Sequence, residues 1–591
     1  MRPIRMLLAS LTVASLAPVV AGSPLGAHAG GHIGTAKSDF TQVTPANAVL
    51  YSTVQSTYPD QPANLRALGK VIAPKFNIQA LVNQVAGSSS GGTSALSAAI
   101  VSQIVSGLGN TFNGELGLAV LPSAVSRSQS GKPTAKLHLL LDAGLQPGVG
   151  AQQLAAPLSL LGSRASSSVR YRNLPIITLD LRTLLGSMGG SLHSTTRYSA
   201  TSPLSGVFYG TVAGNVAVLA SDLPTLKQAI DTWFGAAPSI ASLYDFQTTI
   251  SARPAHRLLT TYVHIDTEQI RPFVTTFAGR SAAKGLPRAP GTLSGAFAVT
   301  AEPDGILMSA SPLVRIGSLA TGQGLPATNA GEPSILPANT LVYAALNDPG
   351  TLIRRLVETL VPRLQGTSSG HIMDPIQALK LATGLNIDND VLSWMHGDAS
   401  LALLPVGSKD FGADSPTTSL SLVATLRVPN QALVEAKLLK INAALQAIPN
   451  SGAAALKFVE VPTASGNPLN MLALTPSGVG FTFYHGYLIV GTALPADYAA
   501  MQQASAGKRL AASPLYTAAL GHFGAHRFGM VFYINVTKLR QTSERIAAAM
   551  GTDLRPYRRG AQPLLSAFTS VSAVAYAGPN AGGAVFLGIG R

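Results

Sequence analysis

The sequence predicts an α+β fold made of two tandem copies of one domain, each a largely antiparallel, curved sheet with helices packed on one face. A repeated phrase indicates the duplication, because VTPANAVLYSTVQSTYP at residues 43–59 returns as ILPANTLVYAALNDPG at residues 335–350. Short apolar stretches bounded by turn residues indicate strands, and apolar residues at helical spacing separate several of them. Hairpins outnumber strict β-α-β alternation, which favours antiparallel sheets.

The matching segments keep the same order in both copies. Three further pairs of segments resemble each other. The difference in residue number between the two members of a pair becomes smaller toward the C-terminus, as small loop deletions in copy two would produce. The pairs are residues 114–122 with 397–405, residues 214–224 with 486–495, and residues 263–271 with 532–540. Chance matches would not keep this order. The sequence therefore predicts copy one over residues 40–315 and copy two over residues 335–591.

The first 29 residues have the pattern of a secretory signal peptide. Arg2 and Arg5 precede an apolar run from residue 6 to residue 20, and AHA at residues 27–29 fits an A-x-A cleavage site. We therefore expect the mature chain to begin near Gly30. The alternative is an uncleaved membrane anchor, but the apolar run is shorter than the roughly 20 residues of a spanning helix.

A linker is expected between the two copies. Residues 316–334, IGSLATGQGLPATNAGEPS, are rich in Gly, Ala, Thr and Pro and contain one charged side chain. This composition is typical of a flexible connection. A second loose stretch, GSSSGGTS at residues 87–94, is expected inside copy one.

Local patterns predict the elements of each copy. A strand follows a proline turn at residues 48–54 and again at residues 340–346, and a helical pattern follows the second over residues 349–364. Asp266 and Asn535 each end a strand and are expected to cap the next helix. The other expected elements are strands at residues 115–122, 136–144 and 169–181, hairpins at 206–221, 294–311 and 572–590, and a helix at 222–234.

Length and composition bound the class of protein. A chain of 591 residues exceeds what one hydrophobic core supports, and 46% hydrophobic residues supply material for more than one. Charged residues make up only 11%, against about 25% in typical domains, so small and uncharged polar residues must cover much of the surface. The chain has no Cys, which excludes disulfides, a thiol nucleophile, thiolate metal sites and iron–sulfur clusters.

The net charge of +15 predicts a soluble basic surface, and the alternative is that this surface binds anionic partners. For an exported protein these are a membrane surface or anionic envelope polymers. Nucleic acid is not expected, because the basic residues are scattered singly and few aromatic residues lie among them. The densest basic cluster is Arg555, Arg558 and Arg559. The sequence leaves the oligomeric state open.

Two segments of copy two resemble a known family. LPANTLVY at residues 336–343 and TGLNIDNDVLSWMHGDASLALLP at residues 383–405 are similar to exported bacterial envelope proteins grouped as a domain of unknown function, number three-three-five-two. Copy one has only SGLGNTFNGELGLAVLP at residues 106–122, without the acidic and aromatic middle. The resemblance covers most of the mature chain and implies an envelope or secreted location. It implies no activity and no catalytic residues.

Motifs for catalysis or metal binding are weak. GSSSG at residues 87–91 matches the G-x-S-x-G pattern of a serine nucleophile, but it lies in a Ser/Gly run without a strand and helix around it. His522 and His526 have the spacing of a metal-binding pair on a helix, but Gly521 and Gly524 favour a loop. No phosphate loop or dinucleotide motif is present, and no cofactor or metal is expected.

Acidic residues offer three further candidates. NIDND at residues 386–390 alternates oxygen ligands as a calcium loop does, but Val391 and Gly397 stand where Gly and Glu are needed, and helix capping is the preferred interpretation. Glu115 and Asp398 fall at equivalent places in the two copies and could share acid–base chemistry, although turn residues before a strand are the simpler interpretation. His264 and Asp266 could join a site assembled from distant segments.

The function that we expect is non-enzymatic binding or scaffolding by an exported cell-envelope protein, with a lipid or another apolar molecule as a possible ligand. A cavity of several hundred Å³ lined by apolar side chains would favour binding, and a filled core would favour scaffolding. The alternative is an extracytoplasmic hydrolase with a site between the two copies. Sequence alone cannot assemble such a site, because catalytic triads are defined in space.

Overall fold

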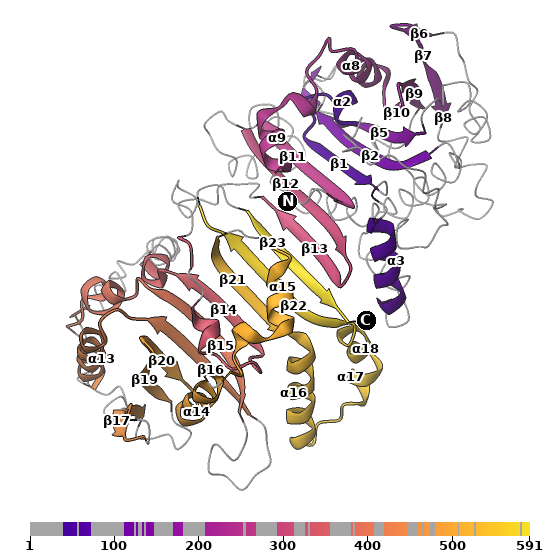
Figure 1. Cartoon of the computed structure of the whole chain (residues 1–591). Coiled ribbons are helices and arrows are strands. Elements are labelled where there is room, and N and C mark those ends of the chain that lie inside the picture. Colours follow the sequence, from indigo (N-terminus) through magenta and orange to yellow (C-terminus); the bar gives the residue numbers. More distant parts are fainter. Residues whose placement is uncertain are drawn as a thin grey trace. The chain divides into compact units, whose positions relative to one another are not determined.

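A computed structural model shows the fold of the chain (Figure 1). It forms two compact units: unit 1 comprises Met1–Pro303 and Met308–Val314, and unit 2 comprises Asp304–Leu307 and Arg315–Arg591. The structure describes residues 40–55, 58, 60–72, 112–122, 126–127, 133–134, 137–146, 169–180, 207–251, 256–266, 292–311, 326–328, 331–354, 380–381, 384–406, 419–446, 458–463, 466–472, 479–505, 507–524, 527–578 and 582–590. The predicted signal peptide, most of the predicted linker, GSSSG and His526 lie outside these residues.

Unit 1 contains an antiparallel sheet with β1 near its middle. β1 pairs with β2 on one side and with β11 on the other, and the described strands follow the order β12-β11-β1-β2-β5-β10-β9-β8. Two short ribbons, β3–β4 and β6–β7, lie outside it. The strands are β1 (Leu50–Gln55), β2 (Phe112–Pro122), β3 (Ser126–Arg127), β4 (Pro133–Thr134), β5 (Leu137–Leu145), β6 (Arg170–Tyr171), β7 (Leu174–Pro175), β8 (Ile177–Asp180), β9 (Val207–Ala213), β10 (Val216–Ala220), β11 (Leu259–Asp266) and β12 (Thr292–Glu302).

One face of this sheet meets helices. Alternate strand residues point to it, so Tyr51 and Tyr262 are buried there, with Phe40 stacked on Tyr51 at 5.4 Å and Phe246 edge-on to Tyr262 at 5.0 Å. Asp222 caps α8, with its Oδ1 accepting a hydrogen bond from the Thr225 backbone N at 2.9 Å. The helices of unit 1 are α2 (Phe40–Val43), α3 (Asp60–Ile72), α8 (Leu223–Trp233), the 3₁₀ turn η2 (Ile240–Ser242) and α9 (Tyr244–Ser251).

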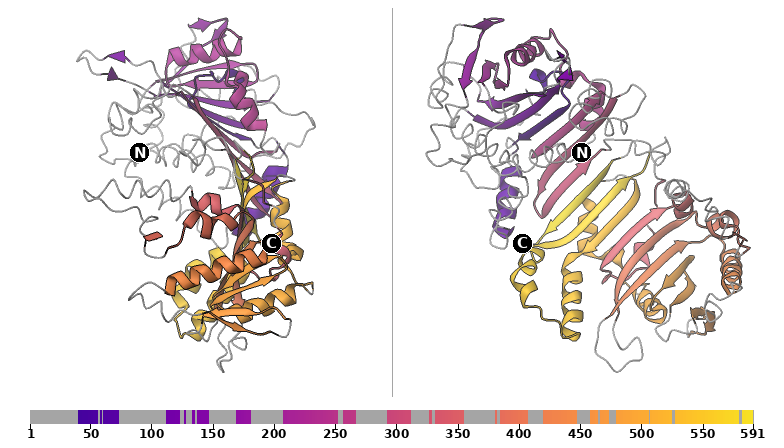
Figure 2. Two further views of the ribbon diagram at one scale, coloured as in Figure 1. Left: turned by 90° about the vertical axis from the view of Figure 1, so that its left-hand side faces the viewer. Right: turned by 180° about the vertical axis from the view of Figure 1, so that it is seen from behind.

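Unit 2 contains antiparallel strands that repeat the order of pairing found in unit 1. β14 pairs with β15 and β21, and the described strands follow the order β23-β22-β21-β14-β15-β16-β20-β19-β18-β17. Figure 2 shows the strands of each unit side by side in one layer. These strands are β14 (Val342–Asn347), β15 (Asp398–Val406), β16 (Ser419–Arg427), β17 (Phe458–Val461), β18 (Leu469–Leu472), β19 (Gly480–Tyr484), β20 (Tyr487–Gly491), β21 (Phe528–Asn535), β22 (Phe568–Tyr576) and β23 (Gly583–Ile589).

Helical elements of unit 2 pack on both faces of its sheet, which corrects the expected one-face arrangement. Val423 and Ile489 lie in one core with side chains of α14 and α15, whereas the alternate side chains Leu426 and Leu488 pack with Val434 of α13 and with Trp394. Because alternate strand residues point to opposite faces, both faces are covered here. The helical elements are η4 (Glu332–Ser334), η5 (Ile387–Val391), η6 (Leu392–Trp394), α13 (Gln431–Gln446), α14 (Leu494–Ser505), η9 (Leu510–Ala512), α15 (Pro514–Gly521), α16 (Val536–Ala549), α17 (Arg555–Arg559) and α18 (Ala561–Leu565).

Several local predictions are confirmed. The fold is α+β, and every described register is antiparallel. The hairpin β9–β10 turns at Gly214, whose φ of 59° favours glycine, and Asn535 caps α16 by accepting a hydrogen bond from the Lys538 backbone N at 2.9 Å. Asp266 ends β11, and the residues after it lie outside the described part.

One sequence alignment is corrected by two residues. The matched segments 263–271 and 532–540 would place His264 level with Tyr533. In the sheets, however, Tyr262 lies opposite Tyr51 and Tyr533 lies opposite Tyr343, so the two buried tyrosines occupy corresponding positions. Both alignments keep the same face of the strand inward, so the cross-strand partners Tyr51 and Tyr343 fix the correspondence. A further strand, β13 (Gly305–Ala310), begins in the segment that belongs to unit 2, where Leu307 joins the core.

Candidate functional site

A pocket of about 300 Å³ lies in unit 2 between helix α15 and the β22–β23 hairpin. Its volume is at the lower end of the range for small-molecule sites. Most of the lining residues are apolar, and Asp304 is the charged residue among them. The lining residues are Asp304, Leu515, Ala518, Ala519, Thr569, Ser570, Phe586, Gly588, Ile589 and Gly590.

Small side chains line part of this pocket. Ala518 and Ala519 face it from α15, and Gly588 faces it from β23. A Cβ atom built on Gly588 would lie 2.4 Å from Ser570 Oγ and 2.8 Å from Thr569 Oγ1, which is closer than atoms can pack. A side chain at position 588 would therefore press into these hydroxyls, and glycine avoids that conflict.

A hydrogen bond and a ring stack support the rim. His522 Nε2 lies 3.2 Å from a carboxylate oxygen of Asp304, and the His522 ring stacks on Phe586 with centroids 3.8 Å apart. The pair holds Phe586 as one apolar wall of the pocket. His522 therefore has a structural partner, and the loop predicted for this region is consistent with its place directly after α15.

Ser570 supplies an unusual polar group. The residue is only 1% exposed, and its Oγ has no hydrogen-bond partner in the described part of the chain. A buried hydroxyl without a partner loses its hydrogen bonds to water and gains none in return. Ser570 belongs to the lining of the pocket, although its Oγ has almost no accessible surface.

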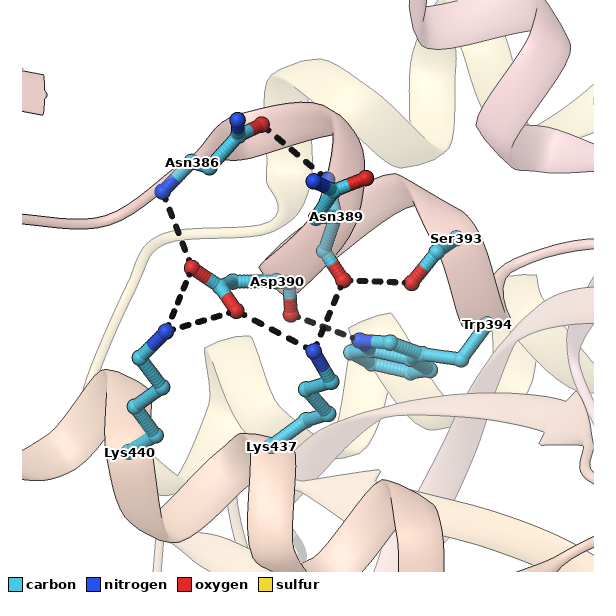
Figure 3. Close-up of polar contacts among 7 residues, drawn as sticks. All are labelled: Asn386, Asn389, Asp390, Ser393, Trp394, Lys437 and Lys440. Atoms are coloured by element: carbon cyan, nitrogen blue, oxygen red, sulfur yellow. Dashed lines mark hydrogen bonds and ion pairs between the residues drawn. The ribbon is translucent and has the colours of Figure 1, made fainter.

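The acidic motif at residues 386–390 forms a polar cluster of its own (Figure 3). The Asp390 side chain is 4% exposed and accepts hydrogen bonds from Lys440 at 2.8 Å, from the Asn386 backbone N at 2.9 Å and from Lys437 at 3.1 Å. These donors hold the pKa of Asp390 well below its usual range. The Asp390 carbonyl accepts a hydrogen bond from Trp394 Nε1 at 2.9 Å.

This cluster confirms the capping interpretation of the motif. Asn386 is the N-cap of η5, and its side chain accepts a hydrogen bond from the Asn389 backbone N at 3.1 Å. Asp388 pairs with Arg354 at 2.8 Å. Both Asp side chains are thus bound to cationic side chains, unlike the ligands of a calcium loop, and Asp390 anchors α13 to η5.

Glu332 and Asp398 are buried near one another in unit 2. Burial raises the pKa of Glu332 to about 7, and the charge of Asp398 adds to that effect. Glu332 Oε2 accepts a weak hydrogen bond from the Tyr343 hydroxyl at 3.4 Å. Sequence analysis missed Glu332, because it lies at the end of the predicted linker and only burial makes it unusual.

The predicted acidic pair occupies corresponding strand positions in different units. Glu115 lies opposite Gln55 in unit 1, and Asp398 lies opposite Asn347 in unit 2. Gln55 Nε2 donates a 3.4 Å hydrogen bond to Glu115 Oε1. Both carboxylates are buried within their own unit, and Glu332 is the acidic group that lies near Asp398.

His264 and Asp266 both lie on β11, and His264 has a tyrosine as its partner. Its Nδ1 lies 3.2 Å from the Tyr262 hydroxyl. Burial lowers the pKa of His264. The negative charges of Asp245 and Asp266 raise it, but by less than burial lowers it. Ser294 Oγ donates to Asp245 Oδ2 at 3.3 Å, so this serine has a carboxylate and not a histidine as its partner.

A comparison with protein-family models identifies the family of the chain. The family model described as Protein of unknown function (DUF3352) matches residues 112–582, which is more than half of the chain. The chain belongs to this family. DUF3352 is the family indicated by the motif at residues 383–405, so the resemblance is confirmed. No curated protein and no solved structure matches the chain.

Two general features of this DUF3352 protein follow from its described residues. Within them, no group of three or more His, Asp or Glu side chains is placed to hold a metal ion. None of the helices described here is long and apolar enough to cross a membrane.

Proposed function

We propose that this protein is an exported cell-envelope protein that binds a small apolar molecule without transforming it. The observation that supports the proposal is the pocket of about 300 Å³ beside α15. Leu515, Phe586 and Ile589 give it an apolar lining, and Asp304 and Thr569 are polar residues of the same lining. This combination of an apolar wall and few polar groups is typical of small-molecule sites.

We also propose that the two units are copies of one domain. The order of strand pairing from β12 to β8 recurs from β22 to β18 and supports this, as does the recurrence of the phrase with Tyr51 and Tyr343, each opposite a buried tyrosine. Each unit also has an isolated bridge at the proline before its first strand, Pro45 with Ser239 and Pro337 with Arg509.

Export and envelope location rest on the first 29 residues, and the net charge of +15 supports a membrane surface or anionic envelope polymers as partners. Sequencing of the mature N-terminus tests this step. Cleavage near Gly30 is the expected result, and a protein that retains residues 1–29 in the cytoplasm would contradict it. The hydrolase with a site between the copies stays a prediction.

Mass spectrometry tests the binding function. The exported protein is measured in its native state and after extraction with organic solvent, and we expect a stoichiometric apolar molecule in the extract. Ala518→Trp, at an exposed position that lines the pocket, should abolish retention of this molecule. Thr517→Trp, at the neighbouring exposed position outside the pocket lining, should leave retention unchanged and is the matched control.

Two results would count against the proposal. A wild-type protein of bare-chain mass that also fails to take up added apolar molecules would exclude binding and favour scaffolding. Retention that is equal in the Ala518→Trp and Thr517→Trp variants would place the ligand elsewhere in the protein.

A further inference from the structure

The helices α16, α17 and α18 form a basic group in unit 2. They connect the end of β21 to the start of β22, and Figure 1 shows the three helices together at that end of the strands. Residues 536–566 contain six basic side chains and two acidic ones. The densest basic cluster of the sequence therefore lies within one group of helices.

Glu544, one of the two acidic residues, holds the group together from inside. Its Oε1 accepts hydrogen bonds from Arg540 Nη1 at 3.0 Å, from the Tyr557 hydroxyl at 3.0 Å and from Gln562 Nε2 at 3.1 Å. These bonds join α16 to α17 and α18. They also offset the charge of Glu544 with that of Arg540, so this carboxylate does not neutralise the arginines at the surface.

The other arginines of the group are exposed to solvent. They are Arg545, Arg555, Arg558 and Arg559. The second acidic residue, Asp553, lies 3.9 Å from Arg555, and both side chains are more than half exposed. Within the described residues, no carboxylate lies within ion-pair distance of Arg558 or Arg559. The surface of the group is therefore positively charged and complementary to a surface of anions.

An exposed apolar side chain accompanies these charges. Met550 ends α16 and is 70% exposed, and the short connection 551–554 separates it from Arg555. A soluble anionic polymer requires only the positive charges. A lipid membrane also takes up an apolar side chain at the boundary between its headgroups and its acyl chains. The combination of exposed arginines and Met550 favours a membrane as the partner.

We propose that the surface of α16–α18 binds an anionic phospholipid membrane. Arg558 and Arg559 contact the phosphate groups, and Met550 enters the apolar boundary. The proposal goes beyond the ligand pocket and rests on the export proposed above, which brings the protein to the outer side of a membrane. It assigns part of the membrane attraction of this basic protein to one group of helices.

Co-sedimentation of the exported protein with vesicles tests the proposal. We expect binding to vesicles of equal parts phosphatidylglycerol and phosphatidylcholine, weaker binding to phosphatidylcholine alone, and a loss of binding as salt is added. The double variant Arg558→Gln/Arg559→Gln should bind the anionic vesicles about thirtyfold more weakly, because each arginine near an anionic membrane contributes about fivefold. Thermal unfolding checks that the variant is folded.

The matched control removes two exposed charges from unit 1. Arg66 and Lys70 lie on α3, and Arg66→Gln/Lys70→Gln lowers the net charge by the same amount. Its binding should stay within about twofold of the wild type, because salt screens charges that do not contact the membrane. Equal weakening in the two double variants, or no weakening in either, would overturn the assignment to α16–α18.

Met550→Gln separates a membrane from a soluble polymer. It should weaken binding to anionic vesicles at least about threefold, through loss of buried apolar area, and leave binding to polyphosphate unchanged. Wild-type vesicle binding by this variant, together with polyphosphate binding as tight as vesicle binding, would overturn the membrane as partner. These results do not depend on the pocket or on cleavage near Gly30, so the function proposed above is contradicted only by its own measurements.

Discussion

Lys440 Nζ lies 2.8 Å from both carboxylate oxygens of Asp390, and Lys437 reaches the same carboxylate from one helical turn earlier in α13. The three side chains anchor α13 to the motif that identifies the family. Removal of the carboxylate leaves two lysines close together without their anion. The arrangement therefore indicates that the motif at residues 386–390 has a structural role in unit 2.

Asp390→Ala should lower the midpoint of thermal unfolding more than Lys440→Ala does, because Lys437 still pairs with Asp390 in the second variant. Arg354→Ala is the control: it breaks the exposed pair with Asp388 and should cost at most about 1 kcal/mol. The pKa of Asp390 is lowered, so its stabilisation is present above the ordinary value of 3.8 and is lost as the pH falls through the lower folded value. Equal midpoints for Asp390→Ala and Arg354→Ala would contradict this role.

Glu332→Gln should remove part of the pH dependence of stability. Burial raises the pKa of Glu332 from 4.5 to about 7, so the folded state binds its proton more tightly than the unfolded state does. Stability from this group is complete below pH 4.5 and falls until about pH 7, by about 3 kcal/mol in total. Denaturant unfolding at pH 5 and pH 8 should therefore show a smaller difference in the variant than in the wild type.

Glu544→Gln is the control for this measurement. Burial raises the pKa of Glu544, but hydrogen bonds from Arg540, Gln562 and Tyr557 outweigh that effect and lower it. The control should therefore lose stability at neutral pH, the opposite sign to Glu332→Gln. A Glu332→Gln variant with the wild-type difference between pH 5 and pH 8 would contradict the assignment.

Asp222→Ala should destabilise unit 1 by about 1–2 kcal/mol through loss of the cap on α8. Burial raises the pKa of Asp222, but hydrogen bonds from His138 and Thr225 outweigh it and lower the pKa to about 2. The stabilisation should thus be present above pH 3.8 and disappear as the pH approaches 2. Chemical unfolding at pH 7 and pH 3 checks this. Ser239→Ala is the control, because Ser239 precedes η2 without a capping hydrogen bond from its side chain.

Gly588→Ala should destabilise unit 2 by about 1–3 kcal/mol, the usual cost of overpacking. Its Cβ would lie 2.4 Å from Ser570 Oγ. Ser570→Ala in the same chain removes this contact, so the double variant should recover part of the lost stability. Thermal unfolding of the two single variants and the double variant measures the coupling. Strictly additive effects would show that the two residues do not contact each other.

The sequence predicted the parts of this protein that depend on neighbouring residues. The turn at Gly214 needs a positive φ, which glycine adopts easily, and Asn535 caps the helix that begins immediately after it. The family could also be predicted from the sequence, because the motif that resembles it is continuous over residues 383–405. These features rest on interactions between residues that are close in the chain.

The sequence by itself therefore determined the α+β class, the antiparallel hairpins, the cap at Asn535 and the family. Only the tertiary structure decided the pocket, the buried Glu332 and the pairing of Asp390 with α13. Leu515 and Ser570 meet the same cavity from a helix and a strand that are far apart in the chain. Burial and the loss of a hydrogen-bond partner arise only when such elements pack together, so residue type and spacing do not reveal them.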